Sequence, residues 1–502
     1  MFAKILIANR GEIAVRVARA CKEMGITPVA IYSDADRTAL HVAHAYEAYR
    51  VGASESRESY LNIPNIMNAC RASGADAVHP GYGFLAENAD FAEACADAGV
   101  AFIGPTPSAM RAMGNKLAAR AAMKKAGVPT VPGSDGPIAN AKDAAKVAKD
   151  IGYPVLLKAA AGGGGKGMRV VRSEAEFDAA LKLTTGEASS AFGDASVYLE
   201  KFVERPKHIE IQVMADGHGN VVTYGERECS MQRRYQKVIE EAPSPIVSPE
   251  MRAALSDAAR KAAQAVDYRG AGTVEFIVDS ERRFYFLEMN TRLQVEHPVT
   301  EMVYGVDLVK QQIEIAGGTA LSVRQQDVVP RGHAIEMRVY AEDPAHNFLP
   351  SIGTIKRLVL PQGPGVRNEN GVYEGYQIPI YYDPMLGKLV VYADTREEAI
   401  RRARRALGEY RCEPVRTNVD FLLWALAEEA FVDGSYDTKH IESHFDASKL
   451  HQRDQEVELA AIAAAIAAYE YRSTVRYATL DESRDGAWRR AARADATKRW
   501  SR

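Results

Sequence analysis

The first hundred residues alternate between short apolar runs and apolar positions at helical spacing. Ile5–Ala8 form one apolar run, apolar residues then recur at helical spacing from Ile13 to Met24, and Gly25 interrupts that pattern. Val29–Tyr32 form the next apolar run. Strand, helix and strand in this order predict an open parallel α/β sheet over residues 1–114. Because its first turn, NRGE, is not glycine-rich, we expect a structural role there rather than a dinucleotide site.

The pattern changes after residue 114. An Ala- and Lys-rich helix and a Pro- and Gly-bearing loop come first, and residues 153–173 then predict a strand, a glycine loop and a second strand. Residues 195–300 predict mostly strands, with one helix near 250–266. Residues 330–445 predict several short strands and then a helix with the charged face TREEAIRRARRAL.

The C-terminal segment, residues 453–502, has a different texture. Its first part, VELAAIAAAIAAYEY, predicts an Ala-rich helix. Its end, RDGAWRRAARADATKRWSR, carries seven Lys or Arg residues against two Asp. We expect a solvated or disordered end. The alternative is docking to a partner protein, because aromatic and Arg side chains favour interfaces.

Composition restricts the class of protein. A chain of 502 residues is long enough for about three domains. A net charge of -3 argues against general affinity for nucleic acid or an anionic membrane. The five cysteines lack C-x-x-C spacing, which favours a reducing compartment over disulfides or a zinc site. Without a signal sequence or a long apolar run, the chain is predicted to be soluble and cytoplasmic.

A predicted hairpin brings acidic residues together. The segments TVEFIVD and FYFLEMN alternate as strands around a four-residue loop. Three facing pairs are expected: Asp279 with Phe284, Ile277 with Phe286, and Glu275 with Glu288. Asn290 shares the face of the two glutamates. Two carboxylates and an amide suit Mg²⁺ or Mn²⁺, and the alternative is an exposed face whose carboxylates meet arginines.

Charged residues cluster directly after this hairpin. In TRLQVEHPVTEM, Arg292 can bind an oxyanion and Glu296 can act as a base. We assign His297 to packing and expect Pro298 to end the segment.

Other charged side chains lie on predicted strands. Lys158 stands in the apolar strand PVLLKAA and needs a partner, for which nucleotide phosphate is a candidate. Arg338 either pairs with Glu336 on its own strand face or projects into a site where negative charge develops. The strand PKHIEIQV places His208, Glu210 and Gln212 on one face, and such polar faces are usually solvent-facing.

The segment MQRRYQKVIEEAP concentrates basic residues beside acidic ones. Arg233, Arg234 and Lys237 lie close to Glu240 and Glu241. Taken alone, the segment predicts a salt-bridged surface turn as readily as a functional site.

The densest glycine run is KAAAGGGGKGMRVV. Gly162–Gly165 are consecutive and Gly167 follows, so the dinucleotide pattern G-x-G-x-x-G is formally present. A P-loop is excluded because Ala160 and Gly167 occupy its required Gly and Ser/Thr positions. A dinucleotide turn must open a helix, whereas MRVVR predicts a strand. We therefore predict a hairpin tip that closes backbone N–H groups over phosphates.

The motifs together resemble one enzyme family. In chain order they are ILIANRGEIAVRV, HPGYGFLAEN, GNKLAAR, KAAAGGGGKGMRVV, EKFVERPKHIEIQV, ERECSMQRRYQKV, EEAPSP, EMNTRLQVEHPVTEM and HAIEMRVYAED. From about residue 1 to residue 445 the chain resembles biotin carboxylase, the ATP-grasp component of acetyl-CoA, propionyl-CoA and pyruvate carboxylases.

The resemblance implies a mixed α/β and α+β architecture. A Rossmann-like N-terminal domain would span 1–114, and an ATP-grasp domain would span 115–329 with a mobile glycine-rich lid at about 133–204. A mixed C-terminal domain would span 330–446. A helical and basic extension would span 447–502.

The resemblance also implies residue roles. Glu296 would be the base that deprotonates bicarbonate, Arg338 would stabilise the biotin enolate, and Arg292 and Lys237 would bind bicarbonate and carboxyphosphate. Val295 would offer backbone contacts to biotin. Two Mg²⁺ or Mn²⁺ ions would be held by Glu275, Glu288 and Asn290. The implied ATP-binding residues are Lys116, Lys158, Gly162, Gly163, Gly164, Gly165, Gly167, Met168, Glu200, Lys201, Val203, His208, Gln232 and Gln236.

The implied activity is ATP- and bicarbonate-dependent carboxylation of biotin N1 through carboxyphosphate. Because no AMKM-type biotin-acceptor motif is present, biotin is expected on a separate biotin carboxyl carrier protein, with a separate carboxyltransferase as a further partner. A homodimer is implied, with Arg16, Arg19 and Glu23 as candidate contacts. Tyr235 departs from the family's usual histidine, which puts the nucleotide contacts there in doubt.

Two alternatives remain. One is another ATP-grasp ligase of the carbamoyl-phosphate or purine-biosynthetic kind, against which the segments RLQVEHPVTE and RVYAED argue. The other is a non-catalytic assembly protein that keeps the fold. The presence of Glu275, Glu288, Arg292, Glu296 and Arg338 argues against that second alternative.

Overall fold

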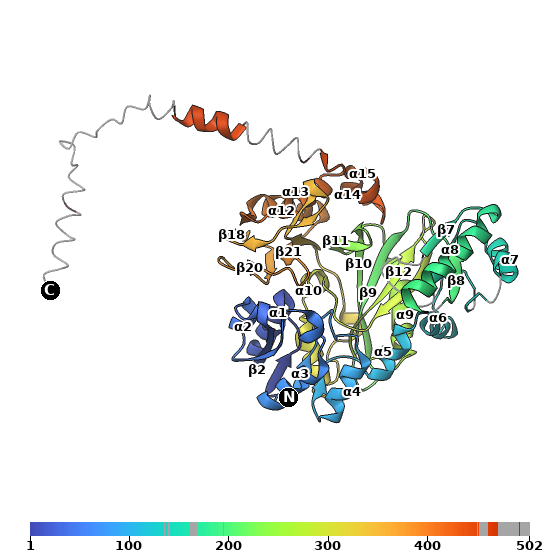
Figure 1. Cartoon of the computed structure of the whole chain (residues 1–502), viewed down its shortest axis with the longest axis horizontal. Helices are drawn as coiled ribbons and strands as arrows, with labels where there is room; N and C mark the ends of the chain where they lie inside the picture. Colours follow the sequence, from blue (N-terminus) through green and yellow to red (C-terminus); the bar gives the residue numbers. More distant parts are fainter. Residues whose placement is uncertain are drawn as a thin grey trace. The chain divides into compact units, whose positions relative to one another are not determined.

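The computed structural model divides into two compact units, residues 1–445 and residues 446–502 (Figure 1). The residues it describes are 1–134, 136–138, 141–159, 168–193, 195–448, 450, 460–469 and 491. Within them, residues 141–143 and 191–192 are described by backbone alone.

A five-stranded parallel sheet forms the N-terminal part, in the order β3-β2-β1-β4-β5. Its strands are β1 (Lys4–Ile7), β2 (Thr27–Ser33), β3 (Glu47–Gly52), β4 (Ala77–His79) and β5 (Ala101–Phe102). Its helices are α1 (Gly11–Glu23), α2 (Leu40–Ala43), α3 (Ile63–Ser73) and α4 (Ala89–Asp97). The predicted strand–helix–strand pattern and the parallel sheet are confirmed.

Helix α1 carries the three candidate dimer contacts, which differ in their exposure. The side chain of Arg16 is 8% exposed, and its guanidinium donates to Glu301 (3.1 Å) and Asp307 (2.7 Å) of the same chain. Arg16 therefore holds the chain together internally, because it lies on the apolar face of α1. Arg19 and Glu23 are exposed.

An eight-stranded antiparallel sheet forms the centre, in the order β13-β12-β9-β10-β11-β14-β21-β19. Its strands are β9 (Lys207–Ala215), β10 (Val221–Arg233), β11 (Gln236–Ala242), β12 (Gly270–Val278), β13 (Phe284–Asn290), β14 (His333–Tyr340), β19 (Val366–Asn370) and β21 (Met385–Ala393). The pairing of β11 with β14 joins the predicted ATP-grasp and C-terminal domains through one continuous sheet.

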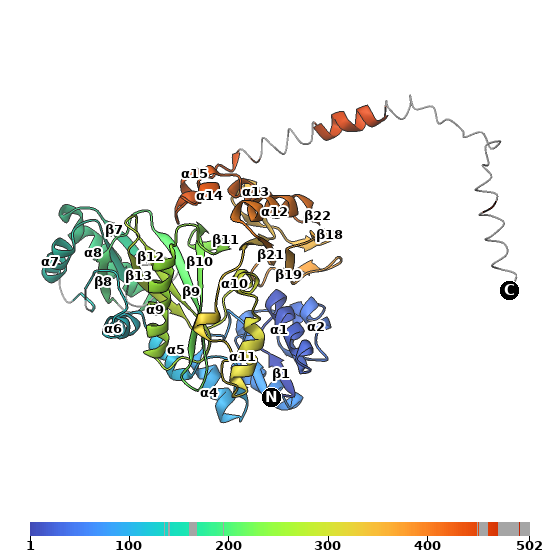
Figure 2. The ribbon, with the colours of Figure 1, turned by 180° about the vertical axis from the view of Figure 1, so that it is seen from behind.

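Strand β9 shows how this sheet separates the core from the site. Ile209, Ile211 and Val213 face a core shared with α9 (Pro249–Gln264), which lies across β9 and β12 (Figure 2). The alternate positions His208, Glu210 and Gln212 share the opposite face, as predicted. These three side chains are largely buried instead of facing solvent, because other elements cover that face.

The remaining helices of this region cover the sheet from both sides. α5 (Pro107–Gly114) and α6 (Lys116–Lys125) contribute to the same core as α9. α10 (His297–Tyr304) packs on β10, β11, β14 and β21. α11 (Leu308–Ala316) packs against α1 and β12.

A separate three-stranded sheet, β7-β6-β8, forms the predicted lid region. Its strands are β6 (Val155–Ala159), β7 (Met168–Val171) and β8 (Val197–Lys201), and its helices are α7 (Ala141–Ile151) and α8 (Glu174–Phe192). β6 and β7 pair antiparallel, with Lys158 opposite Met168, so the predicted hairpin is confirmed by its two strands. Gly162–Gly165 and Gly167 themselves lie outside the described residues.

The C-terminal part of this unit is a set of short strands and helices around β14 and β21. The predicted charged helix is α12 (Arg396–Glu409). The other helices are α13 (Val419–Ala425), α14 (Glu429–Asp433) and α15 (His440–His444). The short strands are β15 (Glu342–Asp343), β16 (Leu349–Pro350), β17 (Gly353–Thr354), β18 (Arg357–Val359), β20 (Gln377–Ile378) and β22 (Arg411–Glu413).

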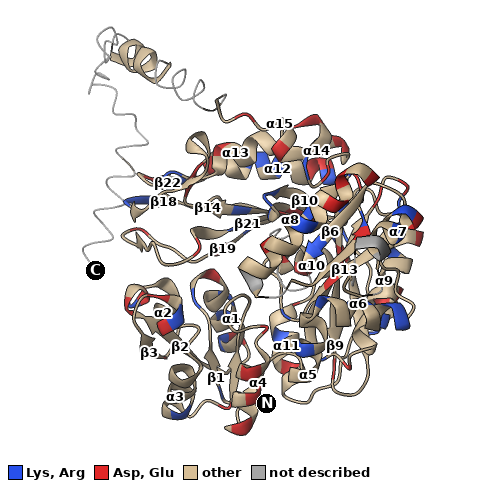
Figure 3. Cartoon of the chain, turned by 45° about the vertical axis from the view of Figure 1, so that its right-hand side comes forward, with Lys and Arg blue, Asp and Glu red and all other residues tan. Residues whose placement is uncertain are grey.

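In the second unit, residues 460–469 are helical, which confirms part of the predicted Ala-rich helix. The basic end lies outside the described residues except for residue 491. Over the described residues, Lys and Arg are interspersed with Asp and Glu (Figure 3). Among the described helices, none has the length and apolar character needed to cross a membrane.

Candidate active site

A cavity of about 470 Å³ lies where the lid sheet faces the central sheet. Most of the predicted site residues that the structure describes line it. They are Lys116, Lys158, Met168, His208, Gln232, Gln236, Lys237, Glu275, Glu288, Asn290, Arg292, Val295 and Arg338. The walls carry many charged and amide side chains, as expected of a site for a charged ligand.

The β12–β13 hairpin places two acidic residues at this cavity. Glu275 faces Glu288 as predicted, but a bulge follows Glu275 and shifts the rest of the register. Phe286 therefore faces Phe276, and Phe284 faces Val278, so the two other predicted pairs are wrong. The turn has one residue more than expected, and the bulge absorbs the difference.

The row continues across the sheet. Glu210 on β9 lies beside Glu275, and Arg227 on β10 lies beside Glu210. Three carboxylates and one guanidinium therefore stand side by side on four adjacent strands. A row of like charges is unfavourable without cations. The protein itself supplies two of them, Arg227 and Lys237.

Glu275 and Glu288 differ in their partners. Glu275 accepts hydrogen bonds from Lys237 Nζ (2.9 Å) and Asn290 Nδ2 (2.8 Å), and lies 2.8 Å from His208 Nε2. Glu288 makes no hydrogen bond or ion pair within the described chain, and burial and the nearby Glu275 raise its pKa. A carboxylate without a protein partner, beside a second carboxylate and an amide, fits a divalent cation.

Lys237 is the centre of the acidic cluster. Its ammonium donates to Glu210 (2.5 Å), Glu275 (2.9 Å) and Glu296 (2.6 Å). Burial alone would lower the pKa of Lys237, but the carboxylates outweigh burial and raise it well above its usual value. In return, Lys237 and Arg338 overcome the effect of burial on Glu296 and hold the pKa of that carboxyl well below its usual range. Glu296 is therefore a fully buried carboxylate at neutral pH.

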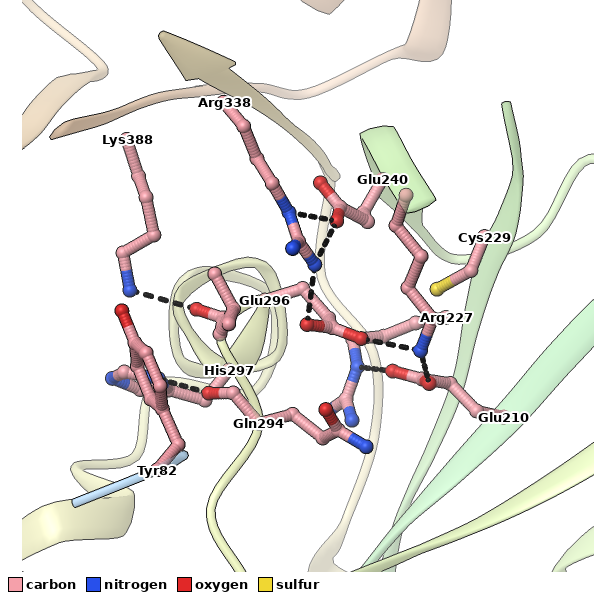
Figure 4. A network of polar contacts seen from close by, with 12 residues as sticks. Tyr82, Glu210, Arg227, Cys229, Glu240, Gln294, Glu296, His297, Arg338 and Lys388 are labelled. Atoms are coloured by element: carbon pink, nitrogen blue, oxygen red, sulfur yellow. Dashed lines mark hydrogen bonds and ion pairs between the residues drawn. The ribbon is translucent and has the colours of Figure 1, made fainter. Parts of the chain in front are cut away.

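Arg338 lies between two carboxylates, Glu240 and Glu296 (Figure 4). Its Nε donates to Glu240 (2.6 Å) and its Nη2 to Glu296 (2.9 Å). Burial raises the pKa of Glu240 to about 7, although Arg338 opposes the rise. The alternative that Arg338 pairs with Glu336 is wrong, because both Glu336 oxygens are buried without a hydrogen bond in the described chain.

A second cavity of about 470 Å³ meets the first one at Arg338. Arg292, Val295 and Arg338 line both cavities. The walls of the second cavity include Arg10, Tyr82, Phe84, Tyr381 and Tyr382. The site therefore has two chambers that share one row of side chains.

The lid-side residues are not all brought together. Lys158 lines the first cavity and pairs with Glu200 (2.5 Å). Lys201 donates to the carbonyl oxygens of Gly152 and Tyr153, and with Val203 it lines a separate hollow. Direct contact of Lys201 and Val203 with the first cavity is therefore absent from the described structure.

Tyr235 stands at the rim of the first cavity. It and Arg234 form the two-residue turn between β10 and β11, both with positive φ. Tyr235 is 69% exposed and lines the cavity. The ring is thus free to stack on a planar ligand.

The segment before α10 is held in place from several sides. Pro298 lies in the first turn of α10, so it begins a helix instead of ending the segment, because proline fits that position. His297 is fully buried with Nδ1 against the Gln294 carbonyl oxygen (2.8 Å), in line with a packing role. Arg292 donates to Glu87 (2.9 Å).

Sequence analysis missed several residues of the site. Arg227 is fully buried among Glu210, Gln212 and Thr273. Lys388 donates to the Val295 carbonyl oxygen (2.7 Å) and pairs with Glu12 (3.2 Å). Each contacts a residue that is remote in sequence, Thr273 in the case of Arg227 and Glu12 in the case of Lys388. A charged residue inside an apolar strand, as in GKLVVYA, was the available clue.

Comparison with known proteins identifies the family. The descriptions "Biotin carboxylase, N-terminal domain" and "Biotin carboxylase C-terminal domain" match residues 1–110 and 336–443. "Carbamoyl-phosphate synthase L chain, ATP binding domain" matches residues 115–324. Biotin carboxylase 1 of Bacillus subtilis is 55% identical over 445 residues, which cover 88% of this chain and 99% of that protein. The chain belongs to the biotin carboxylase family.

Other biotin carboxylase relatives agree. Biotin carboxylase of Haemophilus influenzae is 53% identical over 445 residues, covering 88% of this chain and 98% of that protein. The structure of a Campylobacter jejuni biotin carboxylase with a β,γ-ATP ligand has a TM-score of 0.85 at 49% identity, covering 88% of this chain and 99% of that one. The biotin carboxylase domain dimer of Hydrogenobacter thermophilus 2-oxoglutarate carboxylase, with MgADP and bicarbonate, has a TM-score of 0.83 at 49% identity, covering 88% and 98%.

Family membership establishes the activity in outline. The chain is an ATP-dependent ligase with biotin carboxylase activity, and its substrates are ATP, bicarbonate and biotin. The mixed α/β fold, with a parallel-sheet N-terminal part and an ATP-grasp-type part, matches the solved biotin carboxylase structures.

Proposed function

We propose that the two cavities hold the two halves of the reaction, with nucleotide and bicarbonate in the first and biotin in the second. The observation that carries this proposal is the shared wall, where Arg338, Arg292 and Val295 face both chambers. A reactive carboxyl donor formed in one chamber then reaches biotin without passing through bulk solvent.

In the first chamber, basic and amide side chains bind ATP. Lys158 neutralises phosphate charge from the lid side and Lys116 from the start of α6, while His208, Gln232 and Gln236 orient the nucleotide. Met168, Glu200, Lys201, Val203 and the glycine loop contribute as the lid closes. Glu275, Glu288 and Asn290 would hold two divalent cations, Mg²⁺ or Mn²⁺. A bound cation supplies charge neutralisation of the triphosphate.

Bicarbonate binds between Arg292 and Lys237, beside Glu296. The Glu296 carboxylate takes the proton of bicarbonate, and a bicarbonate oxygen attacks the γ-phosphorus, so carboxyphosphate forms and ADP leaves. Lys237, already bonded to Glu296, keeps the base ionised until the proton arrives.

The second stage happens at the shared wall. Carboxyphosphate breaks down to CO₂ and phosphate, and phosphate accepts the N1 proton of biotin. Arg338 then faces the enolate oxygen of biotin, and N1 forms a bond to CO₂. The Val295 peptide, fixed by Lys388, contributes backbone contacts to biotin.

The partners proposed are a biotin carboxyl carrier protein and a carboxyltransferase, and the assembly is a homodimer with Arg19 and Glu23 near the contact. Separate partners are supported by two relatives named biotin carboxylase, because the matched region covers 99% and 98% of their length and leaves no room for a carrier domain in them. We assign domains at 1–114, 115–329, 330–446 and 447–502. A cytoplasmic location is supported by five buried, free cysteines.

Phosphate release from ATP tests this proposal. With bicarbonate present, free biotin is expected to stimulate release, and omission of bicarbonate is expected to abolish it. Release that ignores biotin but responds to ammonia would instead assign the site to a carbamoyl-phosphate type of ligase.

A further inference from the structure

Four exposed apolar side chains belong to two short segments, one of which runs into the wall of the second cavity at Tyr381. They form what we call the entrance patch: Leu349, Ile352, Ile380 and Tyr381, exposed at 62%, 60%, 69% and 45% respectively. β17 and β20 pair with Gly353 opposite Ile378, so Ile352 and Ile380 leave the same end of this two-stranded sheet. Leu349 precedes Ile352 by three residues and Tyr381 follows Ile380 directly, so the four members of the patch come from two short segments that meet at this sheet end.

The entrance patch continues into the second cavity through one residue. Tyr381 belongs to the patch and also lines the cavity, next to Tyr382 and Asp383. The same cavity reaches Arg338. A biotin that arrives covalently attached to a protein must leave that protein resting beside the cavity it enters. Contiguous exposed apolar side chains are typical of such contact surfaces.

We propose that the entrance patch binds the carrier protein that bears biotin, on the apolar surface around its biotinylated residue. The inference rests on the proposed use of the second cavity for biotin. Free biotin needs only the cavity, whereas attached biotin also needs the patch. The two substrates therefore separate the patch from the chemistry.

The test compares free biotin with the biotinylated carrier as substrates of the double variant Ile352→Asp, Ile380→Asp. The expected result is a rise of about tenfold or more in KM for the carrier, because central apolar contacts dominate interface affinity. The kcat/KM with free biotin is expected to stay within about twofold, because neither residue lines the cavity. Val329→Asp is the matched control, since Val329 is 58% exposed and lies outside the patch.

Each other outcome overturns the inference. An unchanged KM for the carrier means that the patch has no part in carrier binding. An equal loss with free biotin means that the patch acts on the cavity. Loss of dimers with an unchanged carrier KM means that a second copy of the chain covers the patch. If the wild type fails to respond to free biotin, the proposed function itself is wrong, and the double variant is not needed to show it.

Discussion

Replacing Glu240 by Gln separates the charge that holds Arg338 from the shape that surrounds it. Glu240 is fully buried on β11 and bonds Arg338 through Nε (2.6 Å) and Nη2 (2.5 Å). In Glu240→Gln the guanidinium keeps only one carboxylate partner, Glu296. When Glu296 takes the proton of bicarbonate, Arg338 then has no anion to fix its orientation.

The expected loss is in biotin-dependent turnover. Displacement of a catalytic group by about 1 Å costs on the order of 100-fold, so we expect kcat with biotin to fall by about that factor. The KM for ATP is expected to stay near the wild-type value, because Glu240 does not line the nucleotide cavity. Steady-state phosphate release at saturating bicarbonate measures both quantities.

The pH dependence shows whether the negative charge of Glu240 is what holds Arg338. Because the pKa of Glu240 is raised to about 7 by burial, the wild-type residue is neutral below that pH and resembles Gln. The wild-type advantage over Glu240→Gln should therefore be small at pH 6 and grow as the pH rises through about 7. The ratio of wild-type kcat to variant kcat cancels the effects of titrating bicarbonate and the other groups that both enzymes share.

Glu336→Gln is the matched control. Glu336 faces Glu240 across the β11–β14 pair, burial raises its pKa well above the usual value, and its carboxyl oxygens make no hydrogen bond in the described chain, so it does not hold Arg338. Because Arg338 loses no partner in Glu336→Gln, this variant should keep turnover near the wild-type value. If Glu240→Gln and Glu336→Gln lose activity equally, or if the ratio does not change with pH, the reasoning about Arg338 is refuted.

Three further results are expected. Glu241→Gln should destabilise the fold by about 3 kcal/mol in urea unfolding at pH 7, because His333 and Arg396 overcome burial and lower the pKa of Glu241 to about 2. In the wild type this contribution is present above about pH 4.5 and is lost as the pH falls toward 2, so a variant as stable as the wild type at pH 7 contradicts it. Glu288→Gln should raise the Mg²⁺ concentration needed for half-maximal activity by tenfold or more, and an unchanged Mg²⁺ titration removes Glu288 from the metal site. Tyr235→His should change the KM for ATP with kcat unchanged, since Tyr235 lines only the nucleotide cavity, and a change in kcat alone argues against that placement.

Local patterning predicted the elements that carry the site. The pairing of Glu275 with Glu288 needed only two adjacent strands and a short turn, so spacing was sufficient. The predicted residue pairs beyond the bulge were wrong, because alternation along a strand does not reveal where one extra residue is inserted. The parallel N-terminal sheet followed from apolar runs and helical spacing in the same way.

The balance of charges inside the site was beyond local patterning. Glu210 and Arg227 join the acidic row only because β12 pairs with β9, a neighbour that is distant in sequence. Arg227 faces Glu210 through a register shift at Gly225, whose φ of +69° puts it in the left-handed region. A Cβ there would lie 2.0 Å from the Tyr304 hydroxyl. The sequence showed the charges, and sheet order decided which of them meet.

The most direct measurement follows the carbon of bicarbonate. Isotopically labelled bicarbonate, ATP, Mg²⁺ and the biotinylated carrier are incubated with the enzyme, and label on the carrier is compared with phosphate released. A biotin carboxylase with the site described above transfers one labelled carboxyl group for each phosphate, and Glu296→Gln retains ATP binding but transfers none. Phosphate release with no label on biotin, or full transfer by Glu296→Gln, would contradict the assignment.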